Sequence, residues 1–425
     1  MPTRTEAAPE RPVRVLFFHI MKSNFSGAQQ NIYRLLRRID RDKIEPVLVG
    51  QVECELTRRV RTDGIETVII PFPPALDLYD RALLKPSVRQ AFRVLRALWT
   101  YNVALIHEFR AKQPDVVWCD NIRTFFTTYV ACRVARTTMI WNIWSEPAGT
   151  VAWFLHRVAF FLADRVNLEY VDQGPKIFGR LASGGAYKKK VVPLYTGVSD
   201  FERSIGTDIR RELGLTPEDV LLIMASNIVP GKGQVDLLAA MEVLVNEFSH
   251  LHLLIAGAPV DSHTESMRYH ETVRKLAAQD TVAANVHLLG WRSDIMDILK
   301  ASDVYVSTSY GESFPDTVRE AMSAGKPVVV TDVGGTSDLV RVGKSGYLFQ
   351  PGDIPSLVGH IRKLVSAPAL RMEMGVEGTR IIEKRFSTAA YVSEFENMVL
   401  STLPRRSGRW ALRSTSDTTI DSGIT

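Results

Sequence analysis

Short apolar runs alternate along the whole chain with longer segments in which apolar residues recur at helical spacing. Continuous apolar runs are typical of strands covered on both faces, and their alternation with helices is typical of parallel α/β sheets. We therefore expect an α/β fold with two doubly wound, Rossmann-like domains facing each other across a cleft. The expected strands are residues 13–20, 45–51, 66–72, 115–120, 137–144, 166–170 and 190–195 in the front half, and 220–226, 252–258, 285–291, 304–309, 327–332 and 346–350 in the back half.

The domain boundaries follow from the distribution of large apolar residues. These are sparse between Thr196 and Asp219, which is typical of an interdomain link. A ligand is expected in the cleft, at the carboxyl ends of the strands. We expect a flexible N-terminus (1–12), an N-terminal domain (13–198), a C-terminal domain (199–387), a C-terminal helix (388–403) and a disordered, Ser/Thr/Arg-rich tail (404–425).

Charge is distributed unevenly along the 425 residues. Residues 1–200 contain 29 Lys and Arg against 19 Asp and Glu, whereas the remainder contains 23 against 28. The basic front half favours an anionic partner, either a membrane surface or a lipid phosphate. Nucleic acid is not expected, because the basic residues are not interleaved with aromatic residues in a binding motif.

Location is predicted from two further features. The first apolar run, 13–20, is too short to span a bilayer and lacks a cleavage-site pattern, so we expect neither a signal peptide nor a transmembrane helix. The three scattered cysteines indicate a reducing compartment. We therefore expect a cytoplasmic protein.

Residues 83–99 have the pattern of a basic amphipathic helix. One stripe is cationic (Lys85, Arg89, Arg93, Arg96), and the neighbouring stripe is apolar (Leu84, Val88, Phe92, Leu95, Trp99). Such a helix can lie on an anionic bilayer surface. The alternative is that the apolar stripe packs on the sheet and only the arginines face water.

Residues 310–335, YGESFPDTVREAMSAGKPVVVTDVGG, predict a loop, a helix and a short strand. Pro315 and Asp316 suit the first turn of a helix, and Gly325 followed by Lys-Pro marks its end. The stripe expected to be buried consists of Phe314, Val318, Ala321 and Met322.

Two carboxylates flank the start of this helix. Unpaired amides near residues 316–318 can bind an anion. Glu312 lies just before the helix, and Glu320 lies inside it, away from the apolar stripe. An anion with a carboxylate on one side and a diol-binding carboxylate on the other describes a nucleotide-sugar: hexose, diphosphate and ribose.

The spacing of Glu312 and Glu320, followed by AMSAGKPVVVTDVGG, resembles the signature of the retaining, metal-independent GT-B glycosyltransferases of family four, also called glycosyl transferases group 1. The resemblance extends over most of the chain. It implies a GT-B fold whose final helix crosses back to the N-terminal domain. The other segments that match are FSGAQQNIYRLL (25–36), FLADRVN (161–167), VVPLYTGV (191–198), IVPGKGQVDLL (228–238) and SGYLFQPGD (345–353).

The resemblance also implies roles for individual residues. Glu312 would contact sugar hydroxyls near the anomeric centre and, with Lys232, carry the chemistry. Glu320 would bind the ribose, and Lys232 would neutralise the diphosphate. The remaining donor-binding positions are Asn227, Gly233, Ser313, Phe314, Pro315, Asp316, Thr317 and Gly335, and the loop that enters the first helix contributes Ser26, Gly27 and Ala28.

The sequence departs from the family pattern in two places. Asn227 stands where the family usually has an arginine, and Arg292 is our candidate for a substitute cation. The front-domain histidine that many relatives use on the transferred sugar is missing from the segments expected to carry it. Those segments offer Asp120, Asn121, Trp144 and Glu146 as acceptor-side candidates.

The function implied is transfer of a hexose from a nucleoside-diphosphate sugar to a hydroxyl acceptor, with retention. A lipid-linked or envelope-polysaccharide acceptor would suit a peripheral position at the inner face of the cytoplasmic membrane. No cofactor or metal is expected, and Asp40-Arg41-Asp42 is interpreted as a charged loop. The alternatives are a catalytically silent nucleotide-sugar-binding subunit or sensor, and an epimerase with the same architecture.

Overall fold

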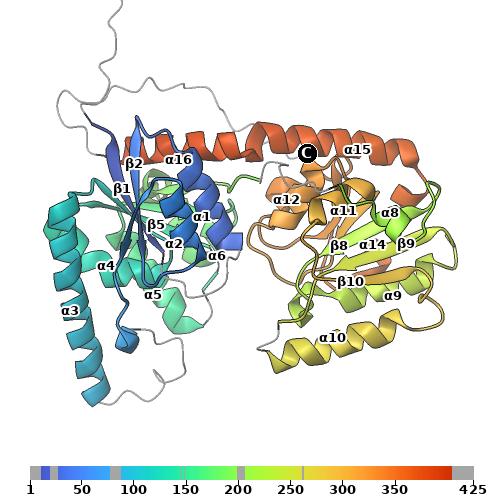
Figure 1. The fold of residues 1–425 in the computed structure, drawn as a ribbon, viewed down its shortest axis with the longest axis horizontal. Helices are drawn as coiled ribbons and strands as arrows, with labels where there is room; N and C mark the ends of the chain where they lie inside the picture. The colour runs from blue at the N-terminus through green and yellow to red at the C-terminus, as the bar shows by residue number, and fades with distance from the viewer. Residues whose placement is uncertain are drawn as a thin grey trace, which may run out of the picture.

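The computed structural model describes residues 11–19, 27–76, 88–144, 146–147, 149–198, 206–260 and 263–403. It contains two parallel sheets of seven and six strands, which lie side by side in Figure 1. Each predicted strand segment overlaps one strand of these sheets, so the expected α/β fold is confirmed. Among the described residues, no helix combines the length and apolar character that crossing a bilayer requires.

The N-terminal sheet has the strand order β3-β2-β1-β4-β5-β6-β7. The chain direction is the same in all seven strands, so their carboxyl ends meet at one edge. Its strands are β1 (Val13–His19), β2 (Ile44–Gly50), β3 (Glu66–Ile69), β4 (Val116–Cys119), β5 (Thr138–Ile143), β6 (Arg165–Leu168) and β7 (Val191–Pro193).

The C-terminal sheet has the order β10-β9-β8-β11-β12-β13 and is also parallel. Both orders reverse direction beside the first strand of the sheet, which is where doubly wound folds bind ligands. Its strands are β8 (Val220–Ala225), β9 (Leu251–Ala256), β10 (Val286–Gly290), β11 (Val304–Ser307), β12 (Val328–Thr331) and β13 (Gly346–Phe349).

Helices cover both faces of each sheet. In the N-terminal part they are α1 (Gly27–Arg38), α2 (Glu55–Thr62), η1 (Pro74–Leu76), α3 (Val88–Lys112), α4 (Ile122–Ala135), α5 (Thr150–Leu162), α6 (Gln173–Phe178), η3 (Gly179–Ser183) and α7 (Gly185–Lys190). In the C-terminal part they are α8 (Ile209–Glu212), η4 (Pro230–Lys232), α9 (Gln234–Leu244), α10 (Thr264–Ala277), α11 (Ile295–Ala301), α12 (Asp316–Ser323), α13 (Thr336–Leu339), α14 (Ile354–Val365), α15 (Pro368–Ile381), η5 (Ile382–Phe386) and α16 (Thr388–Thr402).

The final helices join the two halves of the molecule. Figure 1 shows α15 on the C-terminal part continuing through η5, a π-helical turn, into α16 on the N-terminal part. On α16, Phe395 is fully buried and stacks on Phe17 of β1, with ring centroids 5.5 Å apart. Its ring also meets Trp118 of β4 edge-on at 5.3 Å. Apolar side chains of α16 therefore complete the core on one face of the N-terminal sheet.

The alternation of side chains along β1 explains its continuous apolar sequence. Val15 and Phe17 belong to the core cluster that includes α16, whereas Leu16 and Phe18 belong to the cluster under α3, α4 and α5. Successive side chains of a strand point to opposite faces, so a strand covered on both sides must be apolar at every position.

Candidate functional site

Two of the predicted site residues form an ion pair at the edge of the C-terminal sheet. Lys232 ends η4, in the connection after β8, and Glu312 lies in the connection after β11. Lys232 Nζ is 2.5 Å from Glu312 Oε1, and both side chains are partly buried. Because β8 and β11 are adjacent parallel strands, residues 80 positions apart reach the same point in space.

The loop that holds Lys232 is fastened to the end of β11. The hydroxyl of Thr308 donates to the carbonyl of Gly233 at 2.7 Å, and the amide of Tyr310 donates to the carbonyl of Gly231 at 2.9 Å. Gly233 has φ +69°, and a Cβ there would lie 2.2 Å from the carbonyl oxygen of Thr308. Only glycine satisfies both demands.

A second glycine turn packs against the Glu312 loop. The amide of Gly335 donates to the carbonyl of Ser313 at 2.7 Å. A Cβ on Gly334 would lie 2.1 Å from the carbonyl oxygen of Glu312, and one on Gly335 would lie 2.6 Å from the Phe314 ring. Gly335, a predicted donor-binding position, therefore packs closely against the loop that carries Ser313 and Phe314.

Helix α12 has the predicted buried stripe, because Phe314, Val318, Ala321 and Met322 are all buried. The helix also buries Arg319 completely. Its guanidinium donates to the carboxylate of Asp316 and to the carbonyl of Thr196, and lies 4.6 Å from the centre of the Phe314 ring. The sequence interpretation missed this arginine. The side chain of Asp316 neutralises the buried cation, and its role toward a donor stays a prediction.

A buried tyrosine lies beside the start of α12. The hydroxyl of Tyr305 donates to Thr317 Oγ1 at 2.8 Å. Burial, followed by the negative charges of Glu312 and Glu320, raises the pKa of Tyr305. The donor-binding roles of Glu320 and Thr317 stay predictions.

Across the cleft, the strands of the N-terminal sheet end in a buried polar cluster. Asp120 follows β4 and is 1% exposed. One carboxylate oxygen lies 2.7 Å from His19 Nδ1, and the other accepts a 2.5 Å hydrogen bond from the Trp144 indole. His19 Nε2 is buried and has no hydrogen-bond partner among the residues that the structure describes. The sequence interpretation searched for a histidine after β4 and β5, and it missed the one that ends β1.

The remaining acceptor-side candidates have local partners. The side chain of Asn121 accepts hydrogen bonds from the amides of Arg123 and Thr124, so it caps α4. Glu146 is exposed and accepts a 2.6 Å hydrogen bond from Tyr170. The carboxamide oxygen of Asn121 is therefore used in capping α4 and is poorly placed to bind an acceptor substrate. Glu146 lies on the surface of the N-terminal part.

Ser313 connects the donor-side loop to the N-terminal sheet. Its hydroxyl contacts the carbonyl oxygen of Trp144 at 2.5 Å and also the carboxyl group of Glu169, directly after β6. A hydroxyl has one hydrogen and can donate to only one of these acceptors. A protonated Glu169 resolves the conflict, because it donates to Ser313, which then donates to Trp144.

The surroundings of Glu169 favour its neutral form. Burial raises its pKa to about 8, and the negative charges of Asp316 and Asp120 add to the effect, while Ser313 and Arg319 oppose it. Glu169 was not predicted as a site residue. The signal available was its place at the carboxyl end of an expected strand, the same signal that would have found His19.

Further contacts hold the two halves together below the cleft. Asp338 of α13 accepts a 2.9 Å hydrogen bond from the amide of Val171 and a 3.2 Å hydrogen bond from the hydroxyl of Tyr195. The side chains of Tyr195 and Phe314 pack with ring centroids 5.2 Å apart. The two halves are thus in direct contact through residues that follow strands in both sheets.

Arg292 does not take the place of the missing arginine. Its guanidinium donates four hydrogen bonds, two to Asp294 and two to Glu212. These carboxylates raise the pKa of Arg292, while Arg292 lowers that of Asp294 to about 2. An arginine neutralised by two carboxylates has little charge left for a diphosphate. Asn227 is exposed, and Lys232 pairs directly with Glu312.

Other predicted features lie apart from this cluster or outside the described residues. Ser26 is not among the described residues, and Gly27 and Ala28 open α1. In the described part of the chain, no group of three or more His, Cys, Asp or Glu side chains is placed to hold a metal ion. Cys119 and Cys132 are buried, Cys54 is half-buried, and all three are free thiols.

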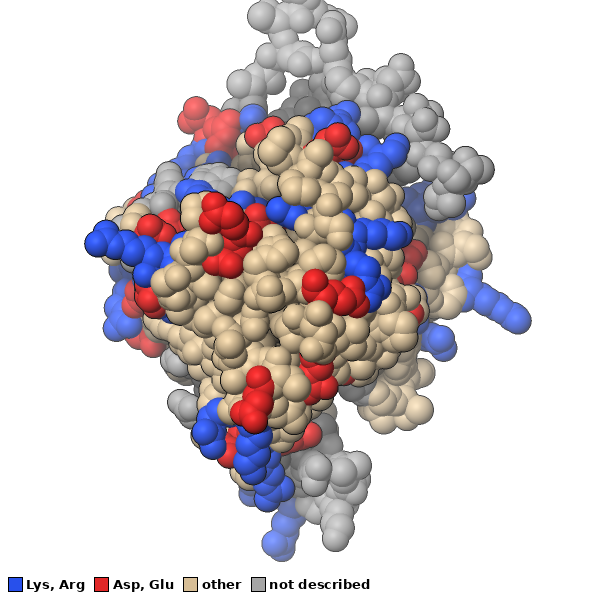
Figure 2. Space-filling model, turned by 90° about the vertical axis from the view of Figure 1, so that its right-hand side faces the viewer, with Lys and Arg blue, Asp and Glu red and all other residues tan. Residues whose placement is uncertain are grey.

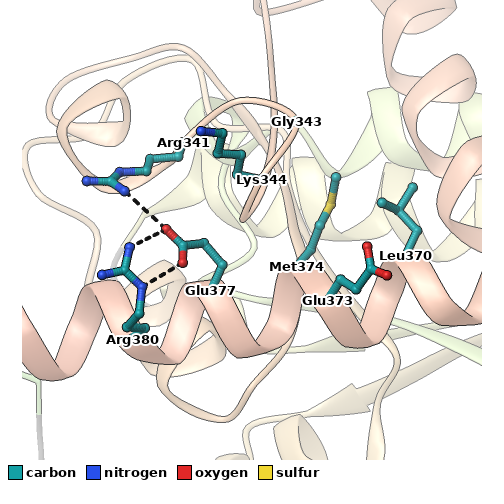
Figure 3. Close-up of a pocket in the computed structure, with 8 residues that line it drawn as sticks. All are labelled: Arg341, Gly343, Lys344, Leu370, Glu373, Met374, Glu377 and Arg380. Atoms are coloured by element: carbon teal, nitrogen blue, oxygen red, sulfur yellow. Dashed lines mark hydrogen bonds and ion pairs between the residues drawn. The ribbon is translucent and has the colours of Figure 1, made fainter. Parts of the chain in front are cut away.

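A surface pocket of about 420 Å³ lies between α15 and the loop before β13. Figure 3 shows Glu377 of α15 between Arg341 and Arg380, with Lys344 above and Met374 on the helix below. Glu377 pairs with both arginines, at 3.2 and 2.7 Å. None of the residues lining this pocket belongs to the predicted site.

Residues 206–380 match the sequence model of the family glycosyl transferases group 1. The chain is 27% identical over 218 residues to N-acetyl-alpha-D-glucosaminyl L-malate synthase of Bacillus anthracis (51% of this chain, 55% of that protein). It is 26% identical over 199 residues to the capsular polysaccharide biosynthesis glycosyltransferase CapM of Staphylococcus aureus (46% and 50%). The matched region spans about half the length of these curated relatives.

Solved structures of glycosyltransferases share the whole architecture. The structure of Anabaena HepE in complex with UDP superimposes with a TM-score of 0.72 and 19% identity, covering 92% of this chain and all of that one. This likeness shows the fold, and the family model matches residues 206–380. We therefore identify residues 206–380 as a domain of the glycosyl transferases group 1 family, within a chain that has the GT-B fold.

Proposed function

We propose that this protein transfers a hexose from a nucleoside-diphosphate sugar to a hydroxyl acceptor, with retention of the anomeric configuration and without a metal ion. The family of residues 206–380 supports a glycosyltransferase, and the similar fold of HepE was solved with UDP. The observation that carries the proposal is the ion pair of Lys232 and Glu312 at the carboxyl ends of β8 and β11.

This ion pair suggests how a donor would engage the site. In the structure, the carboxylate of Glu312 neutralises the ammonium group of Lys232 at 2.5 Å. A diphosphate would compete for the same ammonium group, because charge-assisted hydrogen bonds to phosphate are strong. Glu312 would then be released to accept hydrogen bonds from the sugar hydroxyls. Donor binding thus exchanges one anion for another at Lys232.

Catalysis would come mainly from stabilising the leaving diphosphate. Its charge grows as the bond to the sugar breaks, and fixed donors aimed at that charge lower the barrier. Lys232 supplies one such donor, and the first amides of α12 supply others. The contact of Ser313 with Trp144 and Glu169 places this loop against the N-terminal sheet, where the acceptor is expected.

We further propose a lipid-linked or envelope-polysaccharide acceptor, and a cytoplasmic protein that works at the inner face of the membrane. The name of CapM, a relative in capsular polysaccharide biosynthesis, supports the acceptor class. The excess of basic residues in the first 200 positions supports an anionic surface as partner.

Binding of nucleoside diphosphates by calorimetry tests the role of Lys232. The variant Lys232→Ala should bind UDP, GDP or ADP more weakly by roughly 1.5–3 kcal/mol, about ten- to a hundredfold. The matched control is Lys344→Ala, which changes a lysine of the pocket in Figure 3 and should leave the affinity unchanged. Equal affinity of Lys232→Ala and the parent protein would contradict the proposal.

The exchange at Lys232 gives a second, sharper test. The variant Glu312→Gln removes the competing carboxylate, so the free nucleoside diphosphate should bind more tightly than it does to the parent protein. Hydrolysis or transfer of the sugar by the same variant should fall. Weaker nucleotide binding by Glu312→Gln would rule out the proposed competition.

Product analysis separates the remaining alternatives. The anomeric proton coupling in the NMR spectrum of the product reports retention or inversion, and activity in EDTA reports independence of a metal. Tight nucleotide-sugar binding with no turnover, even with membrane extract added, would favour the sensor or partner subunit. Conversion of the donor sugar into an isomer would favour the epimerase.

A further inference from the structure

The apolar stripe predicted for residues 83–99 faces solvent where the structure describes it. On α3, Phe92, Leu95 and Trp99 are 70%, 65% and 72% exposed. The side of the helix that enters the core is a different one, formed by the buried Tyr101, Leu105 and Phe109. The alternative that the predicted stripe packs on the sheet is therefore wrong. Residues 83–87 lie outside the described residues.

Helices α4 and α5 extend this exposed apolar surface. The three helices form one layer, because Phe109, Phe125 and Phe160 point from α3, α4 and α5 into one core cluster. Ten of the 19 large apolar side chains exposed in the described part of the chain lie on this layer, so the concentration is local. They are Phe92, Leu95, Trp99, Val103, Val130, Val134, Val151, Phe154, Leu155 and Phe161.

The same layer is strongly basic. Helices α3, α4 and α5 together contain eight arginines and lysines and one acidic residue, Glu108. Arg89, Arg93 and Arg96 are exposed, and none of them makes an ion pair with another described residue. By contrast, the end of the C-terminal part seen in Figure 2 shows lysine, arginine and acidic side chains scattered among uncharged residues.

We propose that the outer face of α3, α4 and α5 docks on an anionic membrane surface. The combination of exposed aromatic side chains and unpaired arginines suits the interface between lipid headgroups and acyl chains. Each cation near such a surface improves binding about fivefold. This proposal deepens the membrane location proposed for the enzyme by naming the surface that makes the contact.

The position of the layer connects docking to the site. Helix α5 begins directly after the loop that carries Trp144 and Glu146, and its first turn exposes Val151. Figure 1 shows α3 along the outer edge of the N-terminal part, on the side away from the C-terminal sheet. Docking through this layer would hold the N-terminal part on the lipid and leave the C-terminal part in the cytoplasm.

Flotation with vesicles tests the proposal on the full chain. Vesicles of phosphatidylcholine and phosphatidylglycerol in equal parts should carry the protein upward, and vesicles of phosphatidylcholine alone should not. The double variant Arg93→Gln, Arg96→Gln should bind the anionic vesicles about 25-fold more weakly, at about fivefold for each arginine. No binding, or equal binding to both kinds of vesicle, would overturn the proposal.

The apolar contribution needs its own variant and control. The double variant Phe92→Ser, Trp99→Ser should also lose vesicle binding. Met372→Ser, Val376→Ser should not, although these two residues of α15 are just as exposed. If the arginine double variant and the aromatic double variant both bind vesicles as the parent protein does, the outer face of α3, α4 and α5 is not the docking surface. Nucleotide affinity should be the same in all variants, so that failure of docking is distinguishable from failure of the proposed glycosyl transfer.

Discussion

Replacing Glu169 with glutamine should remove a pH dependence of stability that the cleft contact creates. Glu169 is buried, and its pKa is raised from 4.5 to about 8, chiefly by burial. As the pH rises, the carboxyl group of Glu169 therefore loses its proton at a lower pH in the unfolded chain than in the folded protein. The stabilising effect of the neutral carboxyl is complete below about pH 4.5 and declines until about pH 8.

The magnitude follows from the shift. Between the two pKa values the free energy of unfolding should fall by about 1.4 kcal/mol for each pH unit, which amounts to roughly 2–3 kcal/mol from about pH 5 to pH 7. Glutamine does not titrate, but its amide can still donate to Ser313. The variant Glu169→Gln should therefore lack this slope, and at pH 8 it should be more stable than the parent protein.

Urea unfolding at a series of pH values measures the effect, with a fixed ionic strength. The matched control is Glu373→Gln, which changes an exposed carboxylate on α15 and should keep the slope of the parent protein. If Glu169→Gln has the same slope as the parent, Glu169 is already ionised in the folded protein. The proton assigned to its contact with Ser313 would then be absent.

Three further substitutions test the packing of the site. Gly335→Ala should lower the free energy of unfolding by about 1–3 kcal/mol, because the new methyl group would meet Phe314 and Tyr170. The control Gly311→Ala places its methyl group in open space and should leave the free energy of unfolding unchanged in the same assay. Arg319→Met should lower the unfolding midpoint by an amount equivalent to about 3–5 kcal/mol, because Asp316 loses its buried partner; a change below about 1 kcal/mol would contradict the pairing. His19→Leu should lower the free energy of unfolding by about 1–3 kcal/mol, because the buried carboxylate of Asp120 loses its contact with His19 and keeps the one with the Trp144 indole. The double variant His19→Leu, Asp120→Asn should regain part of that stability.

The fold was predictable from local patterns. Each expected strand was found because strands covered on both faces leave continuous apolar runs such as that of β1. The buried stripe of α12 was found because helical spacing and its proline and glycine signals agree. The convergence of Lys232 and Glu312 was expected only through the family resemblance, since nothing local links residues so far apart.

The partners of individual polar side chains were not predictable from the sequence. Asp316 neutralises Arg319, and Arg292 is held by two carboxylates. The side chain of Asn121 caps α4. In each case a charged or polar group has several possible partners in the sequence, and only the packed chain selects one.

The amino-acid sequence determined the helices, the strands of the two sheets and the tight turns that require glycine. These features depend on periodicity and backbone geometry over a few neighbouring residues. Only the tertiary structure decided that Glu169 meets Ser313, that His19 meets Asp120, and that the apolar stripe of α3 faces solvent. Those outcomes depend on which strand ends meet at a common edge and on how each helix is rotated about its axis. Both are set by the sum of many long-range contacts.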